Sequence, residues 1–428
     1  MAMKESGIEW VGLIPDDWKI AKNNRLFNIS KQLVNENWKN TQLLSLTKSG
    51  IIEKNINDGG GKQPESFGTY QYVEKDDIVL CLFDIDVSAV FSDRSKYDGM
   101  ISPAYRVMKC TDAILPVYAK WWFDAVNIGR YYLIYTKSLR KTTDADGFGN
   151  ILTVVPPLSE QETIADYLDE TCSKIDEIIA EAKASIDEYE NLRQSIIYEI
   201  LTKGPDDNVE MKDSGVEWIG KVPSHWMIGK VKYGTTKVGS GKTPKGGAEV
   251  YMTSGVMFLR SQNIYNDGLR LDNPYYISEE IDEEMKNTRV QKNDVLLNIT
   301  GGSIGRCCIF DGSIPNANVN QHVCIIRVNS SVFLPEYMHL FWISPIGQIS
   351  IKSYQTGGNR EGMSAEAIKN TPIPIIPIGE QRRIVDLIKP KIDDFNSLIS
   401  EKESLINDLE AYKKSLIYEV VTGKRRVV

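Results

Sequence analysis

The chain carries the same framework twice. Residues 3–12 read Met-Lys-Glu-Ser-Gly-Ile-Glu-Trp-Val-Gly, and residues 211–220 read Met-Lys-Asp-Ser-Gly-Val-Glu-Trp-Ile-Gly. A second pair of matching segments lies at 157–161 and 377–381. The offset between copies grows from 208 (3 to 211) to 220 (157 to 377), so the stretches between them differ. A duplicated scaffold with two unlike inserts predicts two unlike ligands, or one ligand contacted at two places.

Two long segments predict helices. Residues 159–202 contain no proline or glycine, and apolar side chains recur every seven residues from Leu168 to Ile196. Residues 380–421 repeat this design, with Pro390 expected to kink or restart the helix. Neither helix can bury its apolar stripe alone. We expect them to pair as an antiparallel coiled coil about a pseudo-twofold axis; the competing option is dimerisation with another molecule.

The two inserts predict mixed α and β structure. Apolar runs at 77–83, 294–299 and 322–328 predict buried strands. Proline-initiated segments at 116–123 and 335–342 predict helices. The expected class is therefore α+β, with two mixed α/β domains joined by two long antiparallel helices. The expected boundaries are 1–153 for the first domain, 154–204 for the first helical region, 205–373 for the second domain and 374–428 for the second helical region.

Composition narrows the function classes. No apolar run approaches the ~18 residues of a membrane span, and the first residues have no apolar signal core, so we expect a cytoplasmic protein without a membrane partner. The six cysteines show no C-x-x-C spacing and there are only three histidines, so no metal site is expected.

The distribution of charge permits DNA binding despite a net charge of −8. Residues 19–153 hold 18 Lys+Arg against 15 Asp+Glu, and residues 227–373 hold 15 against 13. The excess acid lies in residues 157–203, with 4 against 12. Local patches set the attraction for phosphate, so mildly basic inserts are compatible with nucleic acid.

The segments that resemble catalytic motifs are incomplete. The loop at 239–243 reads Gly-Ser-Gly-Lys-Thr, but a phosphate-binding loop needs glycine where Thr236 stands, and Pro244 follows where the helix should continue. Asp272-Asn-Pro-Tyr275 lacks the second proline of an adenine-holding motif. No nucleophile–base pair is apparent. We expect that this chain performs no chemistry by itself.

The duplicated framework resembles the specificity subunit of type I restriction–modification systems over essentially the whole chain. Four patterns carry the resemblance: Glu-Trp-x-Gly-x-x-Pro-x-x-Trp at 9–18 and 217–226, Ser-Gly-Lys-Thr-Pro at 240–244, Asn-Arg-Glu-Gly-Met-Ser at 359–364 running into 373–377, and Glu-Gln plus a long helix at 160–199 and 380–419. The first insert lacks the patterns at 240–244 and 359–364.

The resemblance implies a division of labour. Each insert would be a target-recognition domain reading one half of a split sequence in double-stranded DNA. The helices would fix the spacing and dock modification (methyltransferase) subunits. Those subunits would carry S-adenosylmethionine and methylate adenine, and restriction subunits, where present, would use ATP and Mg. No cofactor is expected in this chain. We expect the half-sites to lie about one helical turn apart, about 34–36 Å.

Candidate DNA contacts are hydrogen-bond donors in or beside turns. In the first insert the segment 138–143 is placed by position where 357–362 lies in the second. The predicted contacts are Lys242, Thr243, Arg260, Asn263, Ser303, Arg306, Asn359 and Arg360 in the second insert, and Lys48, Lys62, Arg94, Lys96, Arg140, Lys141 and Thr143 in the first. Two other functions stay open at this point: a DNA methyltransferase in its own right, and a protein-only scaffold.

Overall fold

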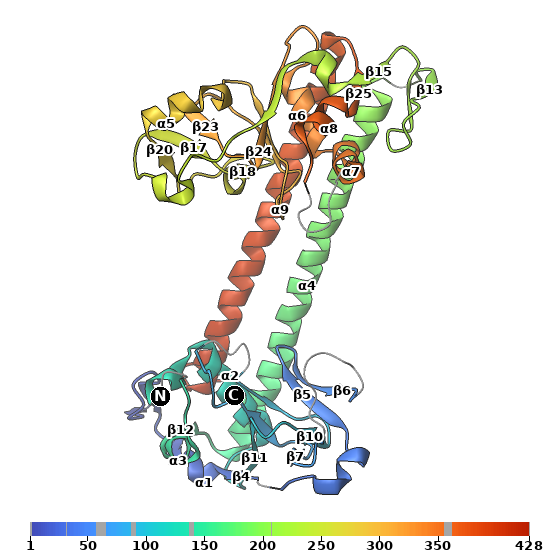
Figure 1. The fold of residues 1–428 in the computed structure, drawn as a ribbon. Coiled ribbons are helices and arrows are strands. Elements are labelled where there is room, and N and C mark those ends of the chain that lie inside the picture. Colours follow the sequence, from blue (N-terminus) through green and yellow to red (C-terminus); the bar gives the residue numbers. More distant parts are fainter. Residues whose placement is uncertain are drawn as a thin grey trace. The chain divides into compact units, whose positions relative to one another are not determined.

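The computed structural model describes residues 2–30, 32–56, 66–86, 91–136, 141–206, 208–354 and 362–427. They form two compact units (Figure 1). Unit 1 comprises Met1–Lys183 and Glu403–Val428, and unit 2 comprises Ala184–Lys402. The boundaries fall inside two long helices, α4 (Leu158–Lys203) and α9 (Ile378–Val421), so each unit contains one segment of each helix.

Unit 1 consists mainly of short strands, with a helix that opens at a proline as expected. Its helices are α1 (Asn23–Leu26), α2 (Pro116–Ile128) and α3 (Ala145–Asn150), with 3-10 turns η1 (Asn35–Asn40) and η2 (Tyr131–Tyr135). Its strands are β1 (Met3–Glu5), β2 (Leu13–Pro15), β3 (Lys19–Lys22), β4 (Phe27–Ile29), β5 (Leu43–Thr47), β6 (Gly50–Lys54), β7 (Gln71–Val73), β8 (Ile78–Leu80), β9 (Ser92–Arg94), β10 (Gly99–Ile101), β11 (Arg106–Cys110) and β12 (Leu152–Val155).

Unit 2 follows the same plan with a larger set of helices. These are α5 (Glu279–Glu284), α6 (Pro335–Ile343), α7 (Pro345–Ser353) and α8 (Ala365–Asn370), with 3-10 turns η3 (Val231–Gly234), η4 (Gly247–Val250), η5 (Ser261–Asn263) and η6 (Lys286–Thr288). Its strands are β13 (Met211–Asp213), β14 (Lys221–Pro223), β15 (Met227–Lys230), β16 (Thr235–Ser240), β17 (Val256–Leu259), β18 (Ile264–Tyr265), β19 (Gly268–Leu269), β20 (Tyr276–Ile277), β21 (Val295–Asn298), β22 (Cys307–Ile309), β23 (Ala317–Val319), β24 (Val323–Val328) and β25 (Pro372–Ile375).

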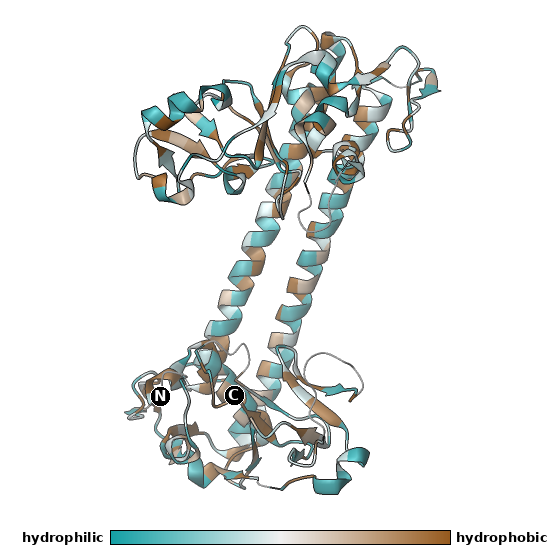
Figure 2. Cartoon of the chain, in the orientation of Figure 1, coloured by the Kyte–Doolittle hydropathy of each residue, from teal (hydrophilic) through white to brown (hydrophobic). Residues whose placement is uncertain are grey.

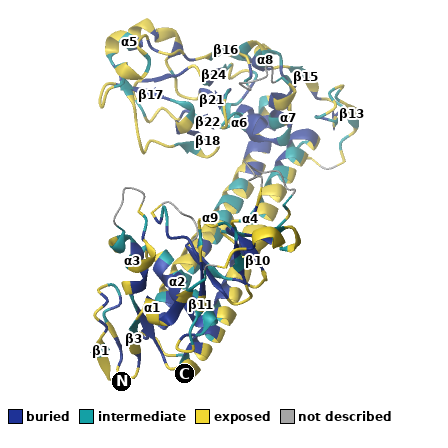
Figure 3. Ribbon diagram, turned by 60° about the horizontal axis from the view of Figure 1, so that its bottom comes forward, coloured by how far each residue is buried: buried dark blue, intermediate teal, exposed yellow. Residues whose placement is uncertain are grey.

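The two inserts share a sheet topology that their sequences do not reveal. In unit 1 the order β4-β11-β8-β9 is antiparallel throughout, and in unit 2 β16-β24-β21-β22 has the same order and sense. A second sheet in each unit contains one parallel pair, β5 with β10 and β17 with β23. The strands β8 and β21 are fully buried, and Figure 3 draws β21 among buried segments. The α+β class and the internal repeat are therefore confirmed.

The repeated Glu-Gln pair anchors each framework. Glu160 accepts a hydrogen bond from Trp18 Nε1 at 3.0 Å, and Glu380 accepts one from Trp226 Nε1 at 2.9 Å. Gln381 is fully buried; its Oε1 accepts from the Leu334 N–H, and its Nε2 donates to two further backbone carbonyls. The other glutamine of the repeat makes the same three kinds of bond in unit 1. Both frameworks are thus held to the start of a long helix by one duplicated network.

Within each unit the helix segments run antiparallel. In unit 1 Glu160 and Asp176 of α4 bond to Arg426 and Lys413, so partner numbers fall along the helix. In unit 2 Arg193 Nη1 donates to Asn396 Oδ1 at 2.7 Å. Hydrophobic residues recur among hydrophilic ones along both helices (Figure 2). Antiparallel pairing of the helices with each other is therefore confirmed.

Pro390 was expected to kink or restart the second helix. Proline removes a backbone donor, yet α9 continues through Pro390 without restarting; the kink stays a prediction. The proline lies on an exposed side of the helix early in α9, where a missing hydrogen bond leaves only a carbonyl that water can reach. The predicted division at 153, 204 and 373 stays a prediction, since the compact units divide the chain inside the helices instead.

Candidate nucleic-acid interface

Four loops of unit 2 meet where strands end. They are 241–243 after β16, 260–263 after β17, 299–306 after β21 and 320–322 after β23, and we call them the strand-end cluster. Backbone bonds join them: Lys242 N–H donates to Val319 O at 3.3 Å, Asn320 N–H to Leu259 O at 3.0 Å, and Ile299 N–H to the backbone oxygen of residue 322 at 3.0 Å. The cluster gathers the described second-insert residues predicted from sequence.

The loop after β16 requires glycine for close approach rather than for phosphate binding. A Cβ on Gly241 would lie 2.0 Å from Val319 O, so no larger residue fits without moving the backbone. The two residues that follow, Lys242 and Thr243, are exposed. This loop therefore presents an ammonium group and a hydroxyl to solvent from a fixed backbone.

Arg260 lies under two tyrosines at the end of β17. Its guanidinium carbon is 3.6 Å from the centre of the Tyr275 ring and 6.0 Å from that of Tyr251. Its Nε and Nη2 are buried without a hydrogen-bond partner among the described residues. Arginine packed against aromatic rings keeps its planar set of donors oriented, and the described residues supply no acceptor for these two nitrogens.

Asn263 has a structural role in the turn, and its predicted contact with DNA stays a prediction. The side chain is buried, its Oδ1 accepts from the Arg260 N–H at 2.9 Å, and its Nδ2 donates to Arg270 O at 2.8 Å. Both polar atoms are engaged in closing the turn. Asn263 therefore shapes the loop that carries Arg260.

Asn298 ties two of the loops together. This fully buried residue donates from Nδ2 to Ser261 O at 2.7 Å and to Ser303 Oγ at 3.1 Å, and its Oδ1 has no partner among the described residues. Its backbone N–H donates to Arg306 O at 2.8 Å. Ser303 and Arg306 are consequently held by a brace that the sequence did not reveal.

The described chain resumes directly beside this loop. Thr300 forms an isolated bridge with Gly362, and Met363 N–H donates to Ile299 O at 2.9 Å. Asn359 and Arg360 lie outside the described residues, so their predicted role stays a prediction.

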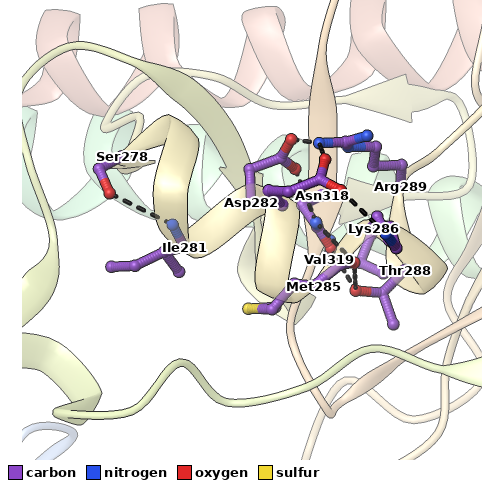
Figure 4. Close-up of polar contacts among 10 residues, drawn as sticks. Ser278, Ile281, Asp282, Met285, Lys286, Thr288, Arg289, Asn318 and Val319 are labelled. Atoms are coloured by element: carbon purple, nitrogen blue, oxygen red, sulfur yellow. Dashed lines mark hydrogen bonds and ion pairs between the residues drawn. The ribbon is translucent and has the colours of Figure 1, made fainter.

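A buried polar network supports the loop after β23 (Figure 4). Asn318 donates from Nδ2 to Asp282 Oδ1 at 2.9 Å and accepts from Thr288 Oγ1 at 2.6 Å. Arg289 Nε closes the network on Asp282 Oδ2 at 2.7 Å. Because Asp282 is 5% and Asn318 0% exposed, these bonds replace lost hydration and fix the end of β23. The network therefore supports the strand that leads into the loop 320–322.

A second buried ion pair lies beneath the same sheet. Arg327 bonds Asp294, which is fully buried, at 2.7 Å through both Nε and Nη2. Burial, and then the positive charge of Arg327, lowers the pKa of Lys237. A charge pair buried this deeply is costly to break, so it fixes the sheet geometry that carries the cluster.

Sequence reasoning missed the aromatic and histidine members of the cluster. Tyr265 and Tyr275 carry the stacked arginines, and His322 Nδ1 shares a hydrogen bond with Thr300 Oγ1. Their sequence signal was slight: Tyr265 stands five residues after an arginine and Tyr275 precedes a second tyrosine. Topology, rather than local pattern, brings them to the strand ends.

Unit 1 offers an equivalent position for Lys48. This exposed residue directly follows β5 just as Arg260 follows β17, and both strands pair in parallel with a neighbour. Lys48-Ser49 thus corresponds to Arg260-Ser261. Lys62 lies outside the described residues.

The segment 138–143 was expected to correspond to 357–362. The structure differs from this alignment by one residue. Thr143 N–H donates to Leu82 O at 3.0 Å as Met363 N–H donates to Ile299 O, so Thr143 corresponds to Met363. Thr143 is buried like its counterpart, and its predicted contact with DNA stays a prediction. Lys141 is exposed, and Arg140 lies outside the described residues.

Arg94 and Lys96 lie at the other end of the sheet from Lys141, and their predicted contacts with DNA stay predictions. Arg94 pairs with Ile78 at the amino end of β8 and forms an ion pair with Asp76 at 3.4 Å. Lys96 is exposed two residues farther on. Lys141 lies near the carboxyl end of β8, where its carbonyl accepts from Ile85 N–H. A position beside a turn in the sequence does not show at which end of the sheet a residue lies.

Among the described ranges, no group of three or more His, Cys, Asp or Glu residues is placed to hold a metal ion. In the same part of the chain, no helix is long and apolar enough to cross a membrane.

Residues 223–408 match the family model described as the type I restriction modification DNA specificity domain. The chain is 24% identical over 287 residues to the EcoBI type I restriction enzyme specificity subunit of Escherichia coli, covering 64% of this chain and 58% of that protein. It is 23% identical over 313 residues to the MjaVIII specificity subunit of Methanocaldococcus jannaschii, covering 69% and 70%. The chain therefore spans under two thirds of the EcoBI relative.

Two solved structures share the fold. A chain of a type I R-M system, solved to explain complex assembly and conformational transition, has a TM-score of 0.72 at 13% identity and covers 96% of this chain and 99% of its own length. The HsdS subunit from Thermoanaerobacter tengcongensis has a TM-score of 0.51 at 13% identity, with coverage of 96% and 98%. The resemblance inferred from the repeated framework is confirmed.

Proposed function

Because this chain carries a type I restriction modification DNA specificity domain and shares the fold of specificity subunits, we propose that it selects the DNA sequence on which a type I restriction–modification complex acts. The observation that carries the proposal is the strand-end cluster. It holds Lys242, Arg260 and Arg306 on loops fixed by backbone bonds and a buried asparagine. Fixed donors of this kind suit base edges and phosphates.

We propose that each unit reads one half of a bipartite target. The support is the common sheet topology with unlike loop residues: Lys48 stands where Arg260 stands in unit 2. Equal scaffolds with different contact residues would recognise different half-sites. Linking two readers in one chain makes the second contact intramolecular and raises overall affinity.

To test DNA selection, the chain is co-expressed with its modification subunits and methylated adenines are mapped across a genome. The expected result is one split sequence with two defined halves. Arg260→Ala should relax one position of one half, and Gln291→Ala, an exposed residue outside the cluster, should leave the site unchanged. Methylation without a sequence preference would refute the proposal.

We further propose that the helices set the gap between half-sites. Seven residues inserted after Lys183 in α4, with seven after Lys402 in α9, add one heptad to each helix and keep the apolar pattern in register. The added length is about 10 Å, or about three base pairs at 3.4 Å each. The gap in the methylated sequence should widen accordingly, from a wild-type separation near one helical turn. An unchanged gap would contradict this role.

The helices are also proposed to dock the modification subunits. Each presents large apolar side chains to solvent: Leu192 is 51% exposed on α4, and Leu398 is 40% exposed on α9. Water-exposed leucines on an otherwise polar helix suit a protein partner. Leu192→Glu with Leu398→Glu should abolish co-purification of the modification subunits. Ile134→Glu, equally apolar and exposed but off the helices, is the control, and equal loss there would contradict the assignment.

The chemistry is assigned to partners. We propose that the chain binds no cofactor and is not an enzyme. S-adenosylmethionine would belong to the modification subunits, and ATP and Mg to restriction subunits where these are present. A cytoplasmic location stays a prediction from the sequence.

A further inference from the structure

Two arginines share one tyrosine ring: Arg306 of the strand-end cluster and Arg270, which follows the β18–β19 hairpin. The guanidinium carbon of Arg306 lies 4.4 Å from the centre of the Tyr265 ring, and that of Arg270 lies 5.2 Å from it. Both side chains gain a cation–π contact there. They differ in their ion pairs and hydrogen bonds, so Arg270 serves as an internal comparison for Arg306.

The positive charge of Arg270 is paired with a carboxylate. Its Nη2 forms an ion pair with Asp267 Oδ2, three residues earlier in the β18–β19 hairpin. That contact and the charge of Asp267 raise the pKa of Arg270. The charge of this guanidinium is already balanced by a carboxylate, which a ligand would have to compete with.

The side chain of Arg306 has no such ion pair within the described ranges. No side-chain hydrogen bond or ion pair joins it to any residue in the described ranges, although the side chain is half-buried. Its guanidinium nitrogens are not among the buried atoms that lack a partner, so they are open to water or to a ligand. Among the described residues, its recorded side-chain contact is with the ring of Tyr265, which lies against the guanidinium while the N–H groups stay open.

The backbone of Arg306 is fixed on both sides. Its carbonyl accepts from Asn298 N–H at 2.8 Å and its N–H donates to Ser303 O at 3.2 Å. Gly305, which precedes it, has a φ of +88° and places its carbonyl on Gln348 Nε2 at 3.0 Å. A side chain on this glycine would be strained and would collide with Gln348. The loop therefore aims Arg306 from a rigid base.

We propose that Arg306 reads a guanine, donating two parallel hydrogen bonds to its O6 and N7, so that the half-site recognised by unit 2 contains a G·C pair. The inference rests on the proposed function and deepens it. A flat fork of donors that is stacked, fixed and unpaired matches the two acceptors of guanine, and this is the commonest specific contact of arginine in the major groove. The exposed Lys242, a flexible point charge, is suited to phosphate instead.

The experiment maps methylated adenines produced by the full complex with wild-type chain, Arg306→Ala, Arg306→Lys and Arg270→Ala. Wild type should give a split site with at least one guanine in the half read by unit 2. Arg306→Ala should reduce the preference for guanine over other bases at one position by roughly 5- to 150-fold. Arg306→Lys keeps the charge but loses the planar fork, so it should relax the same position. Arg270→Ala should leave the site unchanged.

The outcomes separate the two levels of the proposal. A wild-type complex with no bipartite site would overturn the proposed function itself. A bipartite site in which Arg306 variants weaken methylation equally at all sequences would make Arg306 a phosphate contact and overturn this inference alone. Relaxation at a position that is not G·C, or relaxation by Arg270→Ala to the same extent, would also overturn it. Should Arg306→Ala fail to assemble, the Arg306→Lys methylation map decides.

Discussion

Replacement of Gln381 by leucine tests whether the repeated Glu-Gln pair holds each unit together. The amide is 0% exposed and serves three backbone groups: it accepts from Leu334 N–H at 2.8 Å and donates to Val332 O at 2.7 Å and Ile376 O at 2.9 Å. Leucine keeps the volume and removes all three bonds. Each buried group left unpaired costs about 1–3 kcal/mol.

The sum of three such penalties is about 3–9 kcal/mol, and local relaxation favours the lower end, near 3 kcal/mol. Hydrogen–deuterium exchange of peptides from α6 measures this local loss of stability, because amide exchange follows local opening. About 3 kcal/mol corresponds to roughly 100-fold faster exchange. Gln161→Leu should do the same to α2 in unit 1, where the glutamine makes the matching bonds.

Gln291→Leu is the matched control, because that glutamine is exposed and its side chain makes no hydrogen bond within the described ranges. If Gln381→Leu accelerates exchange by less than tenfold, or no more than the control does, the claim that this network holds the framework is refuted.

Three more results are expected. Gly241→Ala places a Cβ against backbone and should destabilise unit 2 by about 1–3 kcal/mol in thermal unfolding, whereas Gly239→Ala, with no atom within 4 Å, should be tolerated. Burial lowers the pKa of His339 below its usual 6.5, so the unfolded chain takes up the proton first; unit 2 should lose stability as the pH falls below about 6.5, and His339→Gln should flatten that slope in urea titrations. Arg327→Met leaves Asp294 buried without its partner and should cost about 3–5 kcal/mol in chemical unfolding, with partial recovery in the double variant carrying Asp294→Asn.

Periodicity located the long helices because their signal is local and repeated. The apolar stripe predicted 159–202 and 380–421, and the structure places α4 at Leu158–Lys203 and α9 at Ile378–Val421. The helix does not restart at Pro390, because near the start of a long, otherwise paired helix one lost bond does not stop propagation.

The candidate site was predicted in part. Residue type and turn position selected Lys242, Arg260 and Arg306, which the strand-end cluster brings together. They could not separate Asn263, which closes a turn, from a free donor, because its partners come from the fold. Strand direction misled the choice of Arg94: a donor beside a turn reaches either end of a sheet, and only pairing decides which.

The assignment of Glu403–Val428 to unit 1 affects how the chain folds during synthesis. Tyr118 Oη donates to Val421 O at 3.2 Å, so a residue made early meets its partner only after residue 421 has been made. Unit 2, Ala184–Lys402, has all its residues before then. Unit 1 is therefore completed after unit 2 during synthesis, and loss of residues 403–428 would damage the unit whose first residues were made earliest.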